Sequence, residues 1–385
     1  MTDPERVLSH ACRYRNEELL RIGLLDLSDE LSIEEVGLEL SALARALLAE
    51  ILELSLRDAD ERFGAPEAGA SLTVLALGSL GGDELSYGSD LDLLFLYSAP
   101  GETRGGRRGR TNHQEYFARA AQRLIGLLAT PVREGFLYRT DSRLRPSGNQ
   151  GALVASLAAF REYHGAQAQL WERQSLLRAS FAAGDRCLFE RALREVIEPT
   201  VYAPLADAAE AGREITRLRR RMELELAGET EGRYNPKLGQ GGLVDIEFTV
   251  QFLQLAHGHR CPDVRGPRTG PALEALARAG LIPQPESFDL RDSHSFLRRL
   301  EGRLRIAHDV RQTHLPRAGR ALAILARRMG PLGDGSGEPG ARLQGEYRRR
   351  TARVRAIFER ITEDGSAGRR AEAEGPEHSK SGGAQ

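Results

Sequence analysis

The sequence predicts an α+β protein, with a helical lead-in, a small strand-containing module and then an all-α helical bundle. Apolar residues recur at three- and four-residue steps along 32–54, which indicates one long amphipathic helix. Two short apolar runs, 71–77 and 91–97, flank a glycine-rich segment and predict strands. From about residue 154 the spacing is helical almost to the end.

The predicted lead-in covers residues 1–62. Within it Ser32 and Glu35 have the spacing of a capping box, in which each side chain bonds the other's backbone N–H. We therefore expect a helix to begin just after Ser32. The sequence Gly-Ala-Pro at 64–66 ends this helical pattern.

Residues 63–153 form the predicted α/β module. After its first two strands, Asn112 and Glu115 resemble a second capping box that begins a helix. The run GFLYRTDSRL (135–144) predicts a third strand, which stops at a Pro-Ser-Gly turn.

The bundle is predicted for residues 154–362, and the polar, glycine-rich stretch 363–385 predicts a disordered tail. One bundle helix is expected at 243–257. Asp245 and Glu247 lie in its first turn, where carboxylates interact favourably with the helix dipole.

The composition argues against a nucleic-acid-binding, a membrane-spanning or a disulfide-rich protein. Lys and Arg total 54 against 55 Asp and Glu, which gives a net charge of −1 and argues against a main role in binding nucleic acid. No apolar run approaches membrane-spanning length. The three cysteines, Cys12, Cys187 and Cys261, are scattered and give no disulfide framework. We therefore expect a cytoplasmic protein.

The second predicted strand opens with the sequence Asp90-Leu91-Asp92. Side chains alternate along a strand, so Asp90 and Asp92 are expected on one face, about 7 Å apart. Two carboxylates so placed can bind the same divalent ion, and Mg²⁺ prefers one or two carboxylates together with substrate phosphates. The pair predicts a metal site.

A glycine turn precedes this pair. The backbone N–H groups at Gly78 and the hydroxyl of Ser79 can approach phosphate oxygens closely. A Gly-Ser turn, a short spacer and an Asp-x-Asp strand together predict a site for a nucleoside triphosphate and its metal, where alignment and charge neutralisation supply most of the catalysis.

The third predicted strand offers Asp141 as a further metal ligand and as the acceptor of a proton from an attacking hydroxyl. Strand alternation is expected to place Arg139, Asp141 and Arg143 on one face. Arg143 and Arg145 are candidates for bidentate binding of phosphate oxygens.

Four ordered blocks resemble one family: GSLGGDELSYGSDLDLLFLY, YRTDSRLRPSGNQGALV, LWERQSLLRA and KLGQGGLVDIEFTVQFLQLAH. They are similar to glutamine synthetase adenylyltransferases, members of the DNA polymerase β-like nucleotidyltransferase superfamily. The resemblance implies a palm-type catalytic domain, Mg²⁺, ATP as substrate and glutamine synthetase as protein partner. A PII-type signalling protein and glutamine are implied as regulators.

The family contains two homologous halves, one that transfers AMP to a tyrosine of glutamine synthetase and one that removes it by phosphorolysis. The sequences RLRPSG and GGLVDIEF resemble the half that transfers AMP, whereas FLRRLEGRLRIAHDVRQTHLP is closer to the half that removes it. Transfer is thus predicted, with removal and a non-catalytic regulatory module as alternatives.

By resemblance, Asp90, Asp92 and Asp141 fall on the metal-binding acidic positions, and Lys237 matches a family lysine with an implied nucleotide role. The chain departs from the family at Ser79, where a lysine is usual.

Overall fold

The computed structural model describes residues 4–306, 313–331 and 337–364. The predicted tail at 363–385 lies outside the described residues, apart from its first two positions. Those two residues complete helix α14 (Pro339–Asp364).

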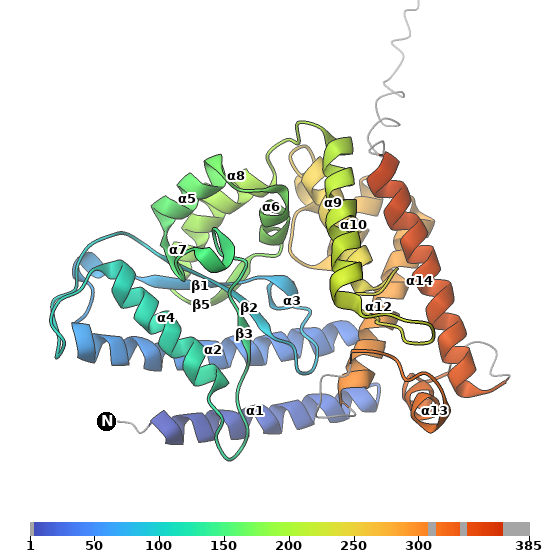
Figure 1. The fold of residues 1–385 in the computed structure, drawn as a ribbon, viewed down its shortest axis with the longest axis horizontal. Coiled ribbons are helices and arrows are strands. Elements are labelled where there is room, and N and C mark those ends of the chain that lie inside the picture. The colour runs from blue at the N-terminus through green and yellow to red at the C-terminus, as the bar shows by residue number, and fades with distance from the viewer. Residues whose placement is uncertain (1–3, 307–312, 332–336, 365–385) are drawn as a thin grey trace, which may run out of the picture.

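Two long helices form the lead-in. Helix α1 (Pro4–Leu27) and helix α2 (Ile33–Phe63) lie side by side along one side of the sheet (Figure 1). The predicted capping box is confirmed: the Glu35 N–H donates to Ser32 Oγ at 3.2 Å, and the Ser32 N–H donates to Glu35 Oε2 at 2.8 Å. The predicted apolar stripe is the buried face of α2.

The sheet is five-stranded, with the order β3-β2-β1-β5 and with β4 also paired to β2. Its strands are β1 (Leu72–Ala76), β2 (Leu91–Tyr97), β3 (Thr140–Asp141), β4 (Val154–Ser156) and β5 (Ser180–Gly184). Strand β1 runs antiparallel to both β2 and β5. On the other edge of β2, β3 pairs in parallel with its beginning and β4 with its end.

Three predicted features differ in the structure. The strand expected at 135–144 has only two residues, because β3 finds a partner only at the beginning of β2. Strands β4 and β5 come from the stretch with helical spacing. Strand β5 reads SFAAG, without β-branched residues, and its pairing with β1 makes it a strand. The glycine turn forms a one-turn helix, α3 (Gly78–Gly81).

Helices surround this sheet. The predicted helix after Asn112 is α4 (His113–Ala129), and the Glu115 N–H donates to Asn112 Oδ1 at 2.8 Å. The other α-helices are α5 (Leu157–Ala166), α6 (Leu170–Leu176), α7 (Arg186–Ala192), α8 (Glu198–Val201), α9 (Ala208–Met222), α10 (Leu243–His257), α11 (Thr269–Arg278), α12 (Gln284–Ile306) and α13 (Gly319–Arg328).

Shorter helical turns lie between these helices. The 3₁₀ turns are Glu67–Gly69, Gly148–Gln150 and Pro262–Val264, and the π turns are Leu193–Ile197 and Glu223–Ala227. None of the described helices is both long enough and apolar enough to span a lipid bilayer.

The sheet separates two apolar cores. Leu91, Leu93 and Phe95 of β2 belong to the core shared with α1, α2 and α4. Leu94 and Leu96, on the opposite face, belong to the core that continues through α5 to α14. Figure 1 shows the second group of helices above and beside the sheet, with α9, α10, α12 and α14 packed together.

Candidate active site at the start of the central strand

Asp92 is the one polar residue in β2, and it is half-buried. It shares a strand face with Leu94 and Leu96, whose side chains pack toward the helices that follow residue 154. The carboxylate of Asp92 therefore faces the junction between the sheet and those helices. Asp90 lies just before the strand and is also half-buried.

Asp141 lies directly beside Asp92. The two residues are register partners in the parallel pairing of β3 with β2, and the Leu91 N–H donates to Arg139 O at 3.0 Å. Neighbouring strands lie about 4.8 Å apart, so paired residues present their side chains to the same face at close range. The structure thus brings together two carboxylates that are far apart in sequence.

The acidic residues influence one another electrostatically. Burial, together with the negative charges of Asp141 and Asp90, raises the pKa of Asp92 to about 6, although the positive charge of Lys237 opposes this shift. A cation between these carboxylates would relieve their repulsion.

Gly78 contacts the carboxylate of Asp92. It has φ of +51°, and a Cβ at this position would lie 2.0 Å from Asp92 Oδ2. The Leu77 N–H donates to the Asp92 backbone oxygen at 2.9 Å. Only glycine allows this close approach, because any side chain would both strain the backbone and displace the carboxylate. Ser79 follows in α3 and is half-buried.

The two predicted phosphate-binding arginines differ in position. Arg143 Nε donates to Asp141 Oδ1 at 3.0 Å and Oδ2 at 2.8 Å, and this contact lowers the pKa of Asp141. Its side chain is 70% exposed, so it can move. Arg145 instead donates from Nη1 to Ser142 O at 2.7 Å and from Nε to Gly151 O at 3.2 Å, within its own loop. Arg139 lies outside the short β3 and stacks on Phe136, 5.6 Å from the ring centroid, so its common face with Asp141 and Arg143 stays a prediction.

Lys237 approaches the carboxylates from the bundle. Its charge lowers the pKa of both Asp92 and the buried Glu301, so its side chain lies near both. The Asn235 side chain fixes the local turn by accepting hydrogen bonds from the Lys237 N–H at 3.1 Å and the Leu238 N–H at 3.0 Å.

A buried ion pair anchors the segment that carries Lys237. Arg219 and Asp245 are both fully buried and pair through Arg219 Nε. Arg219 Nη2 also donates to Leu238 O at 3.0 Å and Gly239 O at 2.6 Å, while Asp245 Oδ2 accepts from the Gly241 N–H at 2.8 Å. The sequence suggested only a helix-dipole role for Asp245. Its actual role is to hold this turn.

A second buried cluster, which the sequence did not predict, holds the glycine turn. Arg178 Nε donates to Gly78 O at 2.9 Å, and its Nη2 pairs with Glu84. Glu84 Oε1 accepts from the Thr269 N–H at 2.7 Å, and Glu84 O accepts from Arg298 Nη1 at 2.6 Å. Arg178 belongs to the LWERQSLLRA block, but nothing in local spacing shows that it reaches residues a hundred positions away.

Although burial alone would raise the pKa of Glu84, the charges of Arg178, His294 and Arg298 lower it to about 2. The carboxylate is therefore ionised at neutral pH. Since α11 and α12 both contribute to this cluster, the position of the glycine turn depends on the bundle.

The residues at the start of β2 have the donor chemistry that Mg²⁺ requires, with carboxylate oxygens beside a glycine turn. Among residues 4–306, 313–331 and 337–364, no three His, Cys, Asp or Glu side chains are gathered closely enough to hold a metal ion. At Asp141, Arg143 engages both oxygens of the carboxylate. A cation that binds Asp141 would have to displace this guanidinium.

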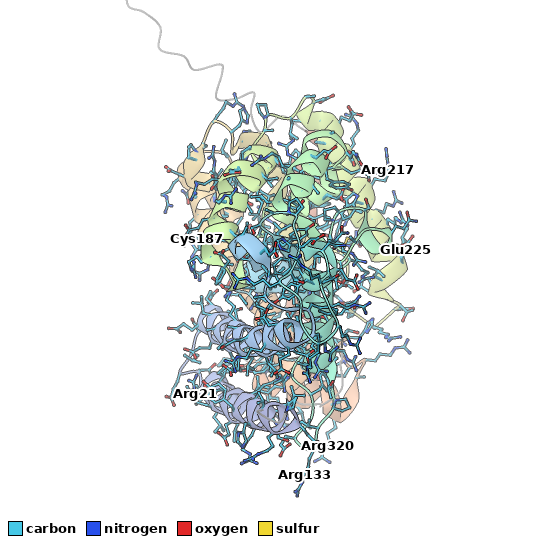
Figure 2. The ribbon with its side chains drawn as sticks, turned by 90° about the vertical axis from the view of Figure 1, so that its left-hand side faces the viewer. Arg21, Arg133, Cys187, Arg217, Glu225 and Arg320 are labelled. Carbon is cyan, nitrogen blue, oxygen red and sulfur yellow. The ribbon has the colours of Figure 1, made fainter. Side chains whose placement is uncertain are left out.

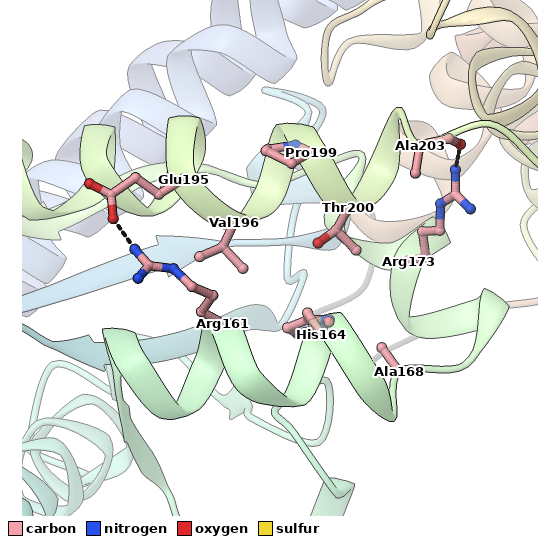
Figure 3. A pocket seen from close by; sticks show the side chains of 10 residues that line it. Arg161, His164, Ala168, Arg173, Glu195, Val196, Pro199, Thr200 and Ala203 are labelled. Atoms are coloured by element: carbon pink, nitrogen blue, oxygen red, sulfur yellow. Dashed lines mark hydrogen bonds and ion pairs between the residues drawn. The ribbon is translucent and has the colours of Figure 1, made fainter.

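Two pockets differ in their relation to these residues. Asp90 lines a pocket of about 740 Å³ that extends toward α1. A second pocket, of about 420 Å³, lies between α5 and the segment 193–203 (Figure 3). Arg161 pairs with Glu195 across it and Arg173 donates to Ala203 O, and none of the three acidic residues lines it. Of the three acidic residues, only Asp90 lines the first pocket.

A small mixed sheet covered by helices, with an acidic pair at the start of its central strand, has the architecture of a nucleotidyltransferase-type protein. Family comparison gives the same class. Residues 1–195, half of the 385-residue chain, match the glutamate-ammonia ligase adenylyltransferase family, and residues 211–362 match GlnD PII-uridylyltransferase. The chain belongs to the glutamate-ammonia ligase adenylyltransferase family.

Proposed function

We propose that this protein transfers AMP from MgATP to a tyrosine hydroxyl of glutamine synthetase. The observation that carries the proposal is the pairing of Asp92 with Asp141 beside Gly78, because it offers carboxylate oxygens next to a backbone that phosphate can approach. Membership of the adenylyltransferase family supports the transferred group and the partner.

Asp90, Asp92 and Asp141 would hold Mg²⁺. The ion supplies charge neutralisation at the transferred phosphate and at the leaving group. The raised pKa of Asp92 fits this role, since neighbouring carboxylates disfavour one another's charge until a cation is present. Arg143 would leave Asp141 and turn to the phosphates, for which its exposed guanidinium is suited.

The nucleotide would lie on the face of β2 that carries Asp92. Gly78 and Ser79 would offer backbone and hydroxyl donors to the phosphates, and Lys237 would add a positive charge from the bundle side. Arg145 would contribute after release from Ser142 O and Gly151 O.

In the proposed step, the tyrosine oxygen forms a bond to the α-phosphorus as the bond from that phosphorus to the bridging oxygen breaks. Pyrophosphate leaves with the bonding electron pair. Asp141 accepts the hydroxyl proton, directly or through water. Arg143 lowers the pKa of Asp141 and so keeps it ionised before the reaction, and departure of Arg143 to the phosphates would make the carboxylate a stronger base.

We propose that the helical bundle regulates the transfer activity. Its match to a PII-uridylyltransferase supports contact with a PII-type signalling protein, with glutamine as a second effector. The buried cluster of Glu84, Arg178 and Arg298 gives a physical route from bundle to glycine turn.

The function is tested by incubating the protein with Mg²⁺, unmodified glutamine synthetase and ATP labelled at its α-phosphate. Label on the synthetase supports transfer. A parallel incubation with orthophosphate and adenylylated synthetase measures removal, in which phosphate attacks the AMP phosphorus and releases ADP and the free tyrosine. Activity in the second incubation alone would replace the proposed direction with its reverse, and activity in neither would refute the function.

A further inference from the structure

The pocket beside Asp90 is bounded by α1, by the segment 87–90 and by the loop 134–139. Figure 1 shows the chain after α4 descending to α1 and then rising to β3, so this loop forms one wall of the pocket. The pocket has a volume of about 740 Å³, and its described lining includes Arg15, Phe136, Tyr138 and Arg139. It thus runs from a predicted catalytic carboxylate to the protein surface.

Two cations in this pocket are held by aromatic rings. The guanidinium of Arg15 lies 5.1 Å from the ring centroid of Tyr138, and that of Arg139 lies 5.6 Å from the ring centroid of Phe136. No carboxylate in the described part of the chain forms an ion pair with either arginine. Stacking fixes the direction of each guanidinium but leaves its charge available to an anion.

Of the other charged residues that line the pocket, Asp90 lies at one end, and Arg305 and Glu134 have ion-pair partners. Arg305 pairs with Glu301 at 2.7 Å, and Glu134 lies 3.7 Å from Arg13. Away from Asp90, the pocket therefore presents the positive charges of Arg15 and Arg139, whereas the whole chain has a net charge of −1. A ligand that binds here gains from carrying negative charge.

The position of the pocket separates it from the proposed nucleotide side. Gly78, Lys237 and Arg143 gather around Asp92, and none of them lines the pocket, which begins at Asp90. Phosphoryl-type transfer needs the attacking and leaving oxygens roughly in line on opposite sides of phosphorus. An acceptor must therefore approach from the side away from the leaving pyrophosphate, and the pocket at Asp90 lies outside the group of residues proposed to hold the triphosphate.

We infer, on the basis of the proposed function, that this pocket is the acceptor site. It binds an acidic segment of the protein substrate and holds the reactive hydroxyl at the Asp90 end. Arg15 and Arg139 bind carboxylates that flank the hydroxyl in sequence. Phe136, 38% exposed, packs against the apolar part of the same segment.

Charge reversal tests the electrostatic part of this inference. Arg139→Glu is expected to raise the KM for glutamine synthetase about tenfold while leaving the KM for ATP within twofold, because it repels the acidic segment and lies away from the nucleotide. Arg133→Glu is the matched control. Arg133 belongs to the same loop, does not line the pocket and projects away from the molecule (Figure 2). An effect of Arg139→Glu on the KM for ATP instead would assign the pocket to the nucleotide and overturn the inference.

Photocrosslinking tests occupancy without relying on turnover. A benzophenone amino acid at position 136 is expected to crosslink to glutamine synthetase, and the crosslink should weaken with Arg139→Glu. The same amino acid at Phe288, which is 68% exposed on α12 and does not line the pocket, is expected to give little product. Equal crosslinking at both positions, or none at 136, would refute the acceptor site.

The two proposals can fail separately. If label transfer works and Arg139→Glu behaves as Arg133→Glu does, the function stands and the acceptor site is wrong. If neither transfer nor removal occurs but position 136 still crosslinks specifically, the pocket binds the synthetase and the catalytic assignment is wrong.

Discussion

Gly78 and Asp92 are in such close contact that a single methyl group at Gly78 would lie 2.0 Å from Asp92 Oδ2. The contact joins the turn proposed to hold phosphate to the carboxylate proposed to hold metal. The geometry of one therefore determines the position of the other.

Gly78→Ala is expected to reduce AMP transfer at least about a hundredfold, because the Cβ displaces the Asp92 carboxylate by roughly an ångström. Gly69→Ala is the control. Gly69 has φ of +65° and nothing within 4 Å of its Cβ position, so it carries the same backbone strain without the contact. Initial transfer rates and melting temperatures of both variants check this. Similar rates in the two variants would contradict the proposed role of the contact.

Arg143→Ala is expected to tighten Mn²⁺ binding to the nucleotide-free protein and to raise the KM for ATP. The first effect follows because Arg143 competes with a cation for both oxygens of Asp141, and the second because a phosphate contact is lost. Calorimetric titration with Mn²⁺ measures the first effect and steady-state kinetics the second. Arg119→Ala, on the exposed face of α4, is the control. Weaker Mn²⁺ binding would show that Asp141 is not a ligand.

Asp245→Asn is expected to lower the free energy of unfolding by roughly 3–5 kcal/mol, since it leaves the buried Arg219 with only the more distant Glu223, at 3.9 Å, as counter-charge. The double variant Asp245→Asn/Arg219→Met is expected to be less destabilised than the single one, because the stranded charge is gone. Denaturant unfolding of the three proteins measures both differences. A double variant less stable than Asp245→Asn would contradict this account of the pair.

His294 makes stability depend on pH. Burial, together with the positive charges of Arg298 and Arg178, lowers its pKa to about 4, although Glu84 and Glu34 act in the opposite direction. The unfolded chain binds a proton at His294 near pH 6.5, whereas the folded chain does so only near pH 4. The stability contribution of neutral His294 is therefore full above pH 6.5 and is lost as pH falls toward 4.

The difference in unfolding free energy between the wild type and His294→Gln should accordingly shrink or reverse between pH 7.5 and pH 4, by up to roughly 3 kcal/mol. Glu84 stays ionised over this range, because its pKa is about 2. Urea unfolding at intervals of pH checks the prediction. A constant difference would show that His294 titrates normally in the folded protein.

Sequence alone predicted the parts of this fold that have a local signal. Strand β2 matches its apolar run from Leu91 to Tyr97, and α2 begins just after the Ser32 cap. The sequence of β5 has no such signal, because Ala-Ala-Gly favours neither helix nor strand. These residues form a strand because they pair with β1. The third strand was predicted too long for a related reason, since pairing partners and not propensity set its length.

The residues of the candidate site also include some that a local sequence pattern predicts and some that it does not. Asp90 and Asp92 were predicted from strand alternation, and Asp141 from the motif that follows them. Arg178 and Glu84 were missed because they meet across ninety-four positions of sequence and carry no periodic pattern. Only the folded chain shows that these two residues support the glycine turn.

The central claim is that Asp92 and its neighbouring carboxylates drive transfer of AMP. The most direct test compares wild-type protein with Asp92→Asn, using glutamine synthetase, Mg²⁺ and ATP labelled at the α-phosphate. We expect label on the synthetase with the wild type and a loss of at least about a thousandfold with Asp92→Asn, while the melting temperature of the variant shows that it remains folded. Label transfer by folded Asp92→Asn at the wild-type rate would contradict the account.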